Sequence, residues 1–132
     1  VDGLPDGAHV NGIVFQERGR ACFDGPRELS KKVRKDLVSF ARRVTPGEGG
    51  DLLGALRLAL AQEAADTVFL LSDGAPSHGE MVDKGRVRSA IRARNRMAKM
   101  IVNAVGLGAE KRTQRAFLEE VAADSGGRVV FR

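Results

Sequence analysis

Apolar, β-prone runs alternate with helical patterns over the second half of the chain, and this alternation constrains the fold more than any other feature. Strand-like runs cover Thr67–Leu71, Met100–Val105 and Val129–Phe131. Between them, apolar residues recur every three or four positions around Arg86–Ala98 and Thr113–Ala123, the spacing of one buried helix face. This order predicts an α/β fold with a mostly parallel sheet and right-handed crossovers. The strand Thr67–Leu71 is expected to be covered on both faces of the sheet.

The first half of the chain predicts a hairpin followed by two helices. Val10–Phe15 and Arg20–Phe23 have the pattern of short strands around a polar turn, so we expect an antiparallel hairpin strand at the sheet edge. Pro26 is expected to start a helix whose apolar stripe extends to Val44. The next helix, from Leu52 to about Ala64, is apolar nearly all round and should be heavily buried.

Length and composition fit one globular domain over residues 1–132. Of the 132 residues, 42% are hydrophobic and 30% are charged, which argues against disorder and against a second core. The apolar runs are far shorter than the ~20 residues that cross a bilayer, so no membrane association is expected. Cys22 is the single cysteine, which excludes an intrachain disulfide, and a small buried hydrophobe is expected there. With no visible signal peptide, these features favour a cytoplasmic location.

The net charge of +5 and the pI near 10.0 raise the question of nucleic-acid binding. Arg88, Arg92, Arg96 and Lys99 fall at steps of three and four on one expected helix and could form a basic patch. However, charges of both signs alternate along the chain, and there is no Trp or Tyr for base stacking. A solvated helix face is therefore favoured, and a basic surface that binds nucleic acid or an acidic partner is the alternative function.

The sequence shows no pattern typical of an enzyme. It has no nucleophile elbow, Walker loop or zinc-ligand spacing, and its histidines are His9 and His78. His78 follows Asp73 in the loop after Thr67–Leu71, but no nucleophile accompanies this pair. The run Gly106-Leu-Gly108 lacks the third glycine of a dinucleotide site. We therefore expect a non-catalytic protein.

Several segments, in the same order, resemble the von Willebrand factor A (vWA) family. Thr67–Pro76, with Gly79 just after it, is similar to the family's fourth strand and the Asp-Gly turn of its metal-ion-dependent adhesion site. Gly49-Gly50-Asp51 before a Leu-Leu-Gly-Ala-Leu helix, Val102–Gly108, and Gly3-Leu-Pro-Asp-Gly7 before the hairpin add to the resemblance. The resemblance covers nearly the whole chain. It implies an open, doubly wound three-layer α/β/α fold and a function in protein–protein recognition.

In this family the adhesion site holds a cation such as Mg²⁺ with oxygen ligands from three loops, the first of which carries Asp-x-Ser-x-Ser. That motif occurs nowhere in the chain, and Gly50 stands where the second loop has a threonine. Asp73 alone aligns with a metal position, and one carboxylate cannot hold Mg²⁺ tightly against water. The resemblance thus implies an incomplete site that takes Mg²⁺ only if the missing segment is supplied. The ligand-binding loops are expected to include Ser72, Asp51 and Ser77.

Each of these positions also has a purely structural explanation. An Asx-type turn at Ser72-Asp73-Gly74 would stabilise the strand end, and this interpretation is the favoured one. Asp51 stands directly before a helix and is expected to act as its N-cap.

The resemblance further implies that the family's first strand, which lies between the hairpin and Thr67–Leu71, is missing. Its absence leaves two facing rows of backbone donors and acceptors, and unpaired edges promote pairing with another chain. Either the hairpin closes onto Thr67–Leu71, or a strand is donated in trans, or the sequence is an N-terminally truncated piece of a longer protein. Expected partners are a protein, including a strand donor or a second copy. A remnant without binding activity is a further alternative.

Overall fold

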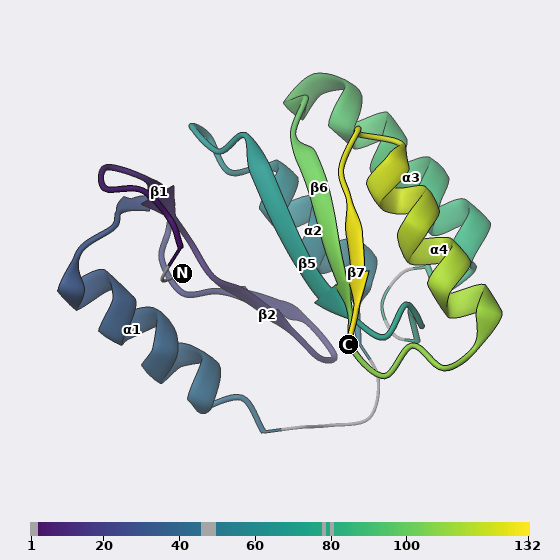
Figure 1. The fold of residues 1–132 in the computed structure, drawn as a ribbon, viewed down its shortest axis with the longest axis horizontal. Helices are drawn as coiled ribbons and strands as arrows, with labels where there is room; N and C mark the ends of the chain where they lie inside the picture. The colour runs from purple at the N-terminus through teal and green to yellow at the C-terminus, as the bar shows by residue number, and fades with distance from the viewer. Residues whose placement is uncertain (1–2, 46–49, 78, 80) are drawn as a thin grey trace.

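The computed structural model describes residues 3–45, 50–77, 79 and 81–132, and these form an α/β fold (Figure 1). The main sheet is parallel, with strand order β5-β6-β7. Its strands are β5 (Thr67–Ser72), β6 (Ile101–Gly106) and β7 (Val129–Phe131). The parallel sheet predicted from the alternating pattern is therefore confirmed.

Three helices cover one face of this sheet: α2 (Leu52–Leu60), α3 (Lys84–Ala98) and α4 (Arg112–Ala123). Aliphatic side chains supply most of the core between the helices and the strands, because apolar burial drives the packing. Of the nine residues of α2, five are buried, as its nearly all-round apolar pattern predicts. The largest fully buried side chains are Leu52, Leu53, Leu56, Leu118, Val87, Val102 and Val121.

The opposite face of the main sheet is open in the described part of the chain. Phe69 is 61% exposed and Leu71 is 55% exposed, whereas Leu70, between them, is buried. Alternate residues of a strand point to opposite faces, so the exposed and buried positions separate by face. The prediction that this strand is covered on both faces is therefore wrong. Val130 on β7 is also exposed, at 48%.

The first half of the chain forms two small antiparallel sheets of its own. Strand β2 (Ile13–Phe15) pairs with β3 (Gly19–Ala21) in the predicted hairpin. Strand β1 (His9–Val10) pairs with β4 (Arg27–Glu28), which was not expected. The single strand expected up to Phe15 is interrupted because Asn11 turns inward, where its side chain bonds the backbone of Phe23 and the side chain of Gln62.

Helix α1 (Lys31–Arg42) begins later than expected. Its N-cap is Ser30, whose hydroxyl accepts a hydrogen bond from the Val33 N–H, so the prediction of a helix start at Pro26 is wrong. Pro26 instead precedes β4. Val33 is the buried residue of the helix, and the rest of its apolar stripe is half-buried or exposed.

The other helices begin within two residues of their expected positions. Asp51 caps α2 and Asp83 caps α3, each by accepting a hydrogen bond from a backbone N–H of the first turn. Met97 is 86% exposed, although the apolar spacing over Arg86–Ala98 predicts one buried helix face. It lies at the carboxyl end of α3, where the chain turns away through Lys99 in the left-handed conformation.

The hairpin is joined to the main sheet through α2 rather than by strand pairing. Helix α2 packs against both β2 and β3 on one side and against α3 on the other. In the described residues β5 pairs only with β6, so the alternative in which the hairpin closes onto β5 is not realised. None of the helices among those residues is long and apolar enough to cross a membrane.

Candidate functional site

The loops that follow β5 and β6 meet at one edge of the main sheet. The N–H of Leu107, directly after β6, donates to the carbonyl of Ser72 at the end of β5, with an N–O distance of 2.9 Å. Leu107 is 45% exposed although it is apolar. This is the edge at which open α/β sheets usually bind ligands.

The turn after β5 is held by two local hydrogen bonds. The Gly74 N–H donates to Ser72 Oγ at 3.1 Å, and the Ala75 N–H donates to Asp73 Oδ1 at 2.9 Å. The second bond makes the Asx-type turn expected from the sequence. Gly74 has a φ of +75°, and a Cβ at this position would overlap the backbone of Gln114 on α4. The sequence Ser-Asp-Gly is therefore explained by close packing and turn geometry, and Asp73 itself is exposed.

The structure brings Asp51 and Ser77 together at the start of α2. The Gly50 N–H donates to Ser77 Oγ at 2.9 Å, and the Ser77 N–H donates to the Gly50 carbonyl at 3.4 Å. Asp51 Oδ1 accepts from the Gly54 N–H at 2.8 Å, which is the expected helix cap. Gly79 lies directly over this carboxylate, where a Cβ would overlap Asp51 Oδ1.

Side-chain oxygen atoms at this edge take part in local hydrogen bonds. The side chains of Ser72, Asp73, Asp51 and Ser77 each accept a hydrogen bond from a backbone N–H. Among the described residues, no three His, Cys, Asp or Glu side chains are grouped so that they could hold a metal ion. A hard divalent cation needs about six oxygen ligands. The pair of Asp73 and His78 considered from the sequence is not described, because His78 lies outside those residues.

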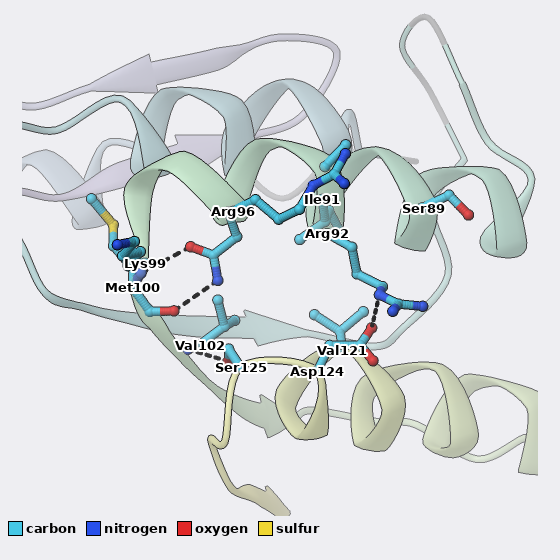
Figure 2. Close-up of a pocket in the computed structure, with 12 residues that line it drawn as sticks. Ser89, Ile91, Arg92, Arg96, Lys99, Met100, Val102, Val121, Asp124 and Ser125 are labelled. Atoms are coloured by element: carbon cyan, nitrogen blue, oxygen red, sulfur yellow. Dashed lines mark hydrogen bonds and ion pairs between the residues drawn. The ribbon is translucent and has the colours of Figure 1, made fainter.

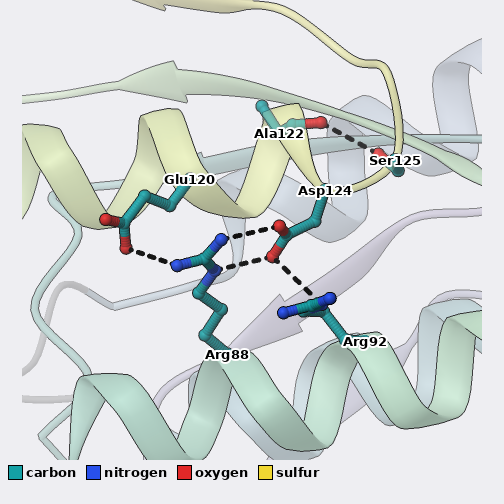
Figure 3. A network of polar contacts seen from close by, with 6 residues as sticks. All are labelled: Arg88, Arg92, Glu120, Ala122, Asp124 and Ser125. Carbon is teal, nitrogen blue, oxygen red and sulfur yellow. Dashed lines mark hydrogen bonds and ion pairs between the residues drawn. The ribbon is translucent and has the colours of Figure 1, made fainter.

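The expected basic patch is divided by an ion-pair network between α3 and α4 (Figure 3). Arg88 Nε and Nη2 each bond the Asp124 carboxylate at 2.7 Å, and Arg88 Nη1 lies 3.1 Å from Glu120 Oε2. Arg92 Nε lies farther from the same carboxylate, at 4.0 Å. Arg88 is thus committed to a bidentate ion pair and does not belong to a free cationic surface.

This network shifts the pKa values of both main partners. The hydrogen bond from Arg88 is the largest cause that holds the pKa of Asp124 below its ordinary range, with Arg92 adding to it. The hydrogen bond to Asp124 likewise raises the pKa of Arg88 above its ordinary value. Both groups are therefore charged at neutral pH, and the network links the two helices.

The remaining cations of the patch surround a groove of about 620 Å³ at the carboxyl ends of α3 and α4 (Figure 2). Arg92, Arg96 and Lys99 are exposed along its rim. Polar residues of its wall serve the fold: Asn95 exchanges two hydrogen bonds with the Met100 backbone, and Ser125 Oγ accepts from the Val102 N–H. The cations also lie near helix carboxyl termini, where positive charge is favourable without any ligand.

Two residues near these sites were not found by sequence reasoning. In the sequence, Leu107 is only an apolar residue in a glycine-rich loop after a strand, and its exposure can be known only from the fold. Asp124 lies 36 positions from Arg88, and a pair so distant in sequence can be recognised only once α3 is packed on α4.

Cys22 is half-buried, and burial, followed by the nearby Asp36, raises the pKa of its thiol. A raised pKa disfavours the reactive thiolate.

Comparisons with known proteins agree with this fold. The family model for the von Willebrand factor type A domain matches residues 1–131. Among solved structures, a von Willebrand factor type A protein from Catenulispora acidiphila is similar, with a TM-score of 0.77 and 18% sequence identity. The match covers 99% of this chain but 31% of that chain, so the chain spans less than a third of its solved relative. No curated protein matches the sequence. The chain belongs to the von Willebrand factor type A domain family.

Proposed function

We propose that this domain is a non-catalytic protein-recognition module that binds its partner through the loops at the carboxyl edge of β5 and β6. The observation that carries the proposal is the pairing of an exposed carboxylate with an exposed aliphatic side chain there. Asp73 lies on a turn fixed by backbone hydrogen bonds, and Leu107 is bonded to the residue before it. A preformed apolar contact beside a charge suits a partner segment with a hydrophobic and a basic side chain.

We further propose that the adhesion site of the family is degenerate here. The local hydrogen bonds of Asp73, Asp51 and Ser77 support this proposal, because these oxygens already stabilise turns and a helix start. Mg²⁺ would be held only if another segment supplied the remaining oxygen ligands. Titration of the isolated domain with MgCl₂ in a calorimeter is expected to show no tight binding, and a micromolar dissociation constant would contradict the proposal.

Matched variants test the recognition surface. The immobilised domain captures its partner from a cell extract, and capture by Asp73→Asn and Leu107→Ser is expected to fall by about tenfold or more. The asparagine keeps the turn, because its side-chain oxygen still accepts the Ala75 N–H. Asp66→Asn, at the opposite end of β5, is the control and should capture as the wild type does. Equal capture by all variants, or turnover of a substrate by the domain, would exclude this function.

The alternative function, a basic surface for nucleic acid or an acidic partner, is favoured by one observation. Arg92, Arg96 and Lys99 are exposed around one groove. Two observations argue against this alternative. Arg88 is held in an ion pair, and the other cations lie near helix carboxyl termini, where positive charge is favourable without a ligand. Retention on heparin that moderate salt and Arg92→Glu both abolish would support this alternative.

A further inference from the structure

The groove between the carboxyl ends of α3 and α4 lies at the amino ends of the main-sheet strands. Lys99 is the C-cap of α3, directly before β6, and Ser125 Oγ accepts the Val102 N–H of β6 at 2.8 Å. The loop edge assigned above to recognition is at the opposite ends of these strands. A ligand of this groove would therefore narrow the alternative function given above, on which it builds, and would be independent of the loop edge.

The side-chain acceptors that line the groove are already engaged, apart from the exposed hydroxyl of Ser89. Asn95 Oδ1 and Ser125 Oγ each accept a hydrogen bond from a backbone N–H near the start of β6. The two carboxylate oxygens of Asp124 each accept from Arg88 at 2.7 Å. A ligand that offers hydrogen-bond donors would therefore find few free acceptors here.

The cations of the groove, in contrast, have unused donors. Arg96 and Lys99 make no hydrogen bond or ion pair with any described residue. Arg92 Nε lies 4.0 Å from Asp124, which is too long for a hydrogen bond, and 63% of the Arg92 side chain is exposed. An arginine has five N–H donors and a lysine ammonium has three. The groove therefore suits a ligand that carries acceptors and negative charge.

The end of α3 explains only part of this positive charge. A helix carboxyl terminus favours cations within its last turn, which here includes Arg96 and Lys99. Arg92 lies about two turns before the C-cap, a rise of about 10 Å along the helix axis, and is outside that turn. The one carboxylate in the lining, that of Asp124, is already paired with Arg88. Three cations are therefore left in excess around the groove.

The spacing of these cations matches alternate residues of an extended chain. Arg92 and Arg96 are about one helical turn apart, or about 6 Å along the axis of α3. Alternate residues of an extended segment lie about 6.6 Å apart and point to the same side. Figure 2 shows the cations on the α3 side of the groove, with Asp124 and Ser125 on the α4 side. Carboxylates at alternate positions of one segment could therefore meet both arginines, with a third close to Lys99.

The surroundings of the groove favour an acidic peptide over nucleic acid or a second copy. No lining residue is aromatic, so nucleic-acid bases would find no stacking partner. Glu120, exposed on the α4 side, would repel a phosphate chain that extended beyond the groove. A second copy carries the same net charge of +5, so the two copies would repel each other.

We propose that this groove binds a short acidic segment of a partner protein, in which Arg92, Arg96 and Lys99 contact carboxylates at alternate positions. Each arginine can hold a carboxylate through two parallel hydrogen bonds, which adds direction to the attraction of opposite charges. Because these side chains are exposed, the interaction weakens as salt is added.

A synthetic peptide tests this proposal on the protein as it stands. The probe is Gly-Glu-Ser-Glu-Ser-Glu-Gly with a neutral fluorophore at its amino end, and fluorescence anisotropy measures its binding at low salt. The same peptide with glutamine in place of each glutamate keeps the shape but loses the charge, and it should bind at least about tenfold more weakly. Binding of the glutamate peptide should fall as NaCl is raised from about 0.01 M to about 0.1 M.

Two charge reversals on the same helix locate the binding. Arg96→Glu removes a cation of the groove and should weaken peptide binding by about tenfold or more. Arg94→Glu changes the net charge equally at an exposed position outside the groove lining, and its affinity should stay within about twofold of wild type. Circular dichroism checks that both variants are folded. Leu107→Ser, at the loop edge, should also bind the peptide as the wild type does, so this test and the recognition test fail separately.

Four results would overturn the proposal. Equal binding of the glutamate and glutamine peptides would remove the role of charge. Equal losses in Arg94→Glu and Arg96→Glu would assign binding to the overall charge of the domain. Tighter binding of an oligothymidylate with the same number of charges would assign the groove to nucleic acid. Displacement of the peptide by inorganic phosphate at the same concentration would assign the groove to a free anion.

Discussion

The position of Asp51 allows two interpretations, a helix cap and a cation ligand. Its carboxylate accepts the Gly54 N–H at the start of α2, and it lies beside the Ser77 loop, where the family resemblance implies a cation site. A helix cap needs only an acceptor oxygen, whereas a cation site needs negative charge. The two roles therefore respond differently to removal of the charge alone.

We predict that Asp51→Ala lowers the free energy of unfolding by about 1 kcal/mol, because the first turn of α2 loses its cap. Asp51→Asn should stay within a few tenths of the wild-type value, since asparagine caps helices as well as aspartate does. Urea denaturation followed by circular dichroism measures both. An equal loss in the two variants would show that the charge, rather than the cap, stabilises this region.

For single residues, the sequence predicts the interactions that are made with residues close by in the chain. The Asx turn at Asp73 and the cap at Asp51 each involve residues two or three positions apart, so the local sequence specifies them. Whether Arg88 is free or held in an ion pair depends on Asp124, which belongs to another helix. Helical spacing could place Arg88 on a basic stripe, but it could not reveal an acidic neighbour from α4.

Helices α3 and α4 are linked by this ion pair, which gives the domain a predictable response to pH. The folded state holds the pKa of Asp124 below its ordinary value, so the carboxylate stabilises the fold at a pH above about 4, the unfolded-state pKa. That contribution is lost as the pH falls through the lower, folded-state pKa.

We predict that Asp124→Asn lowers the melting temperature by a few degrees at pH 7, and that the difference from wild type shrinks as the pH falls below about 4. Glu119→Gln, at an exposed position on α4, is the control and should leave the melting temperature nearly unchanged. Differential scanning calorimetry at several pH values measures the effect. A difference that is constant from pH 7 to pH 3 would assign it to packing instead of charge.

Elements with a clear internal period were predicted well, and elements defined by distant partners were not. The strands and helices from Leu52 onward lie close to their expected positions because their apolar spacing is local. The pairing of β1 with β4 was missed, since each strand has only two residues and no alternation to detect. The start of α1 was misplaced because Pro26 is acceptable both before a helix and beside an edge strand.

At the scale of the whole molecule, the core lies between the main sheet and the helices α2, α3 and α4. Leu118 is 0% exposed within this core. Leu56 is 2% exposed yet also lines a groove between β2 and β5. The two leucines therefore have similar burial but different surroundings.

We predict that Leu118→Ala costs more stability than Leu56→Ala, within the range of about 2–5 kcal/mol for buried leucines. The cavity left by Leu118 would be enclosed on all sides, whereas the space left by Leu56 would merge with the groove. Guanidinium denaturation measures both free energies of unfolding. If Leu56→Ala were the more costly change, the groove would have to be filled in solution.

The attachment of the hairpin through α2 gives the two halves of the domain unequal resistance to opening. No strand ladder joins β2 to β5 in the described residues, so the hairpin can separate from the α2 surface without breaking any backbone pairing of the main sheet. Such a segment behaves as its own cooperative unit in native-state amide exchange. Amides of β2 and β3 should exchange with deuterium well before those of β6.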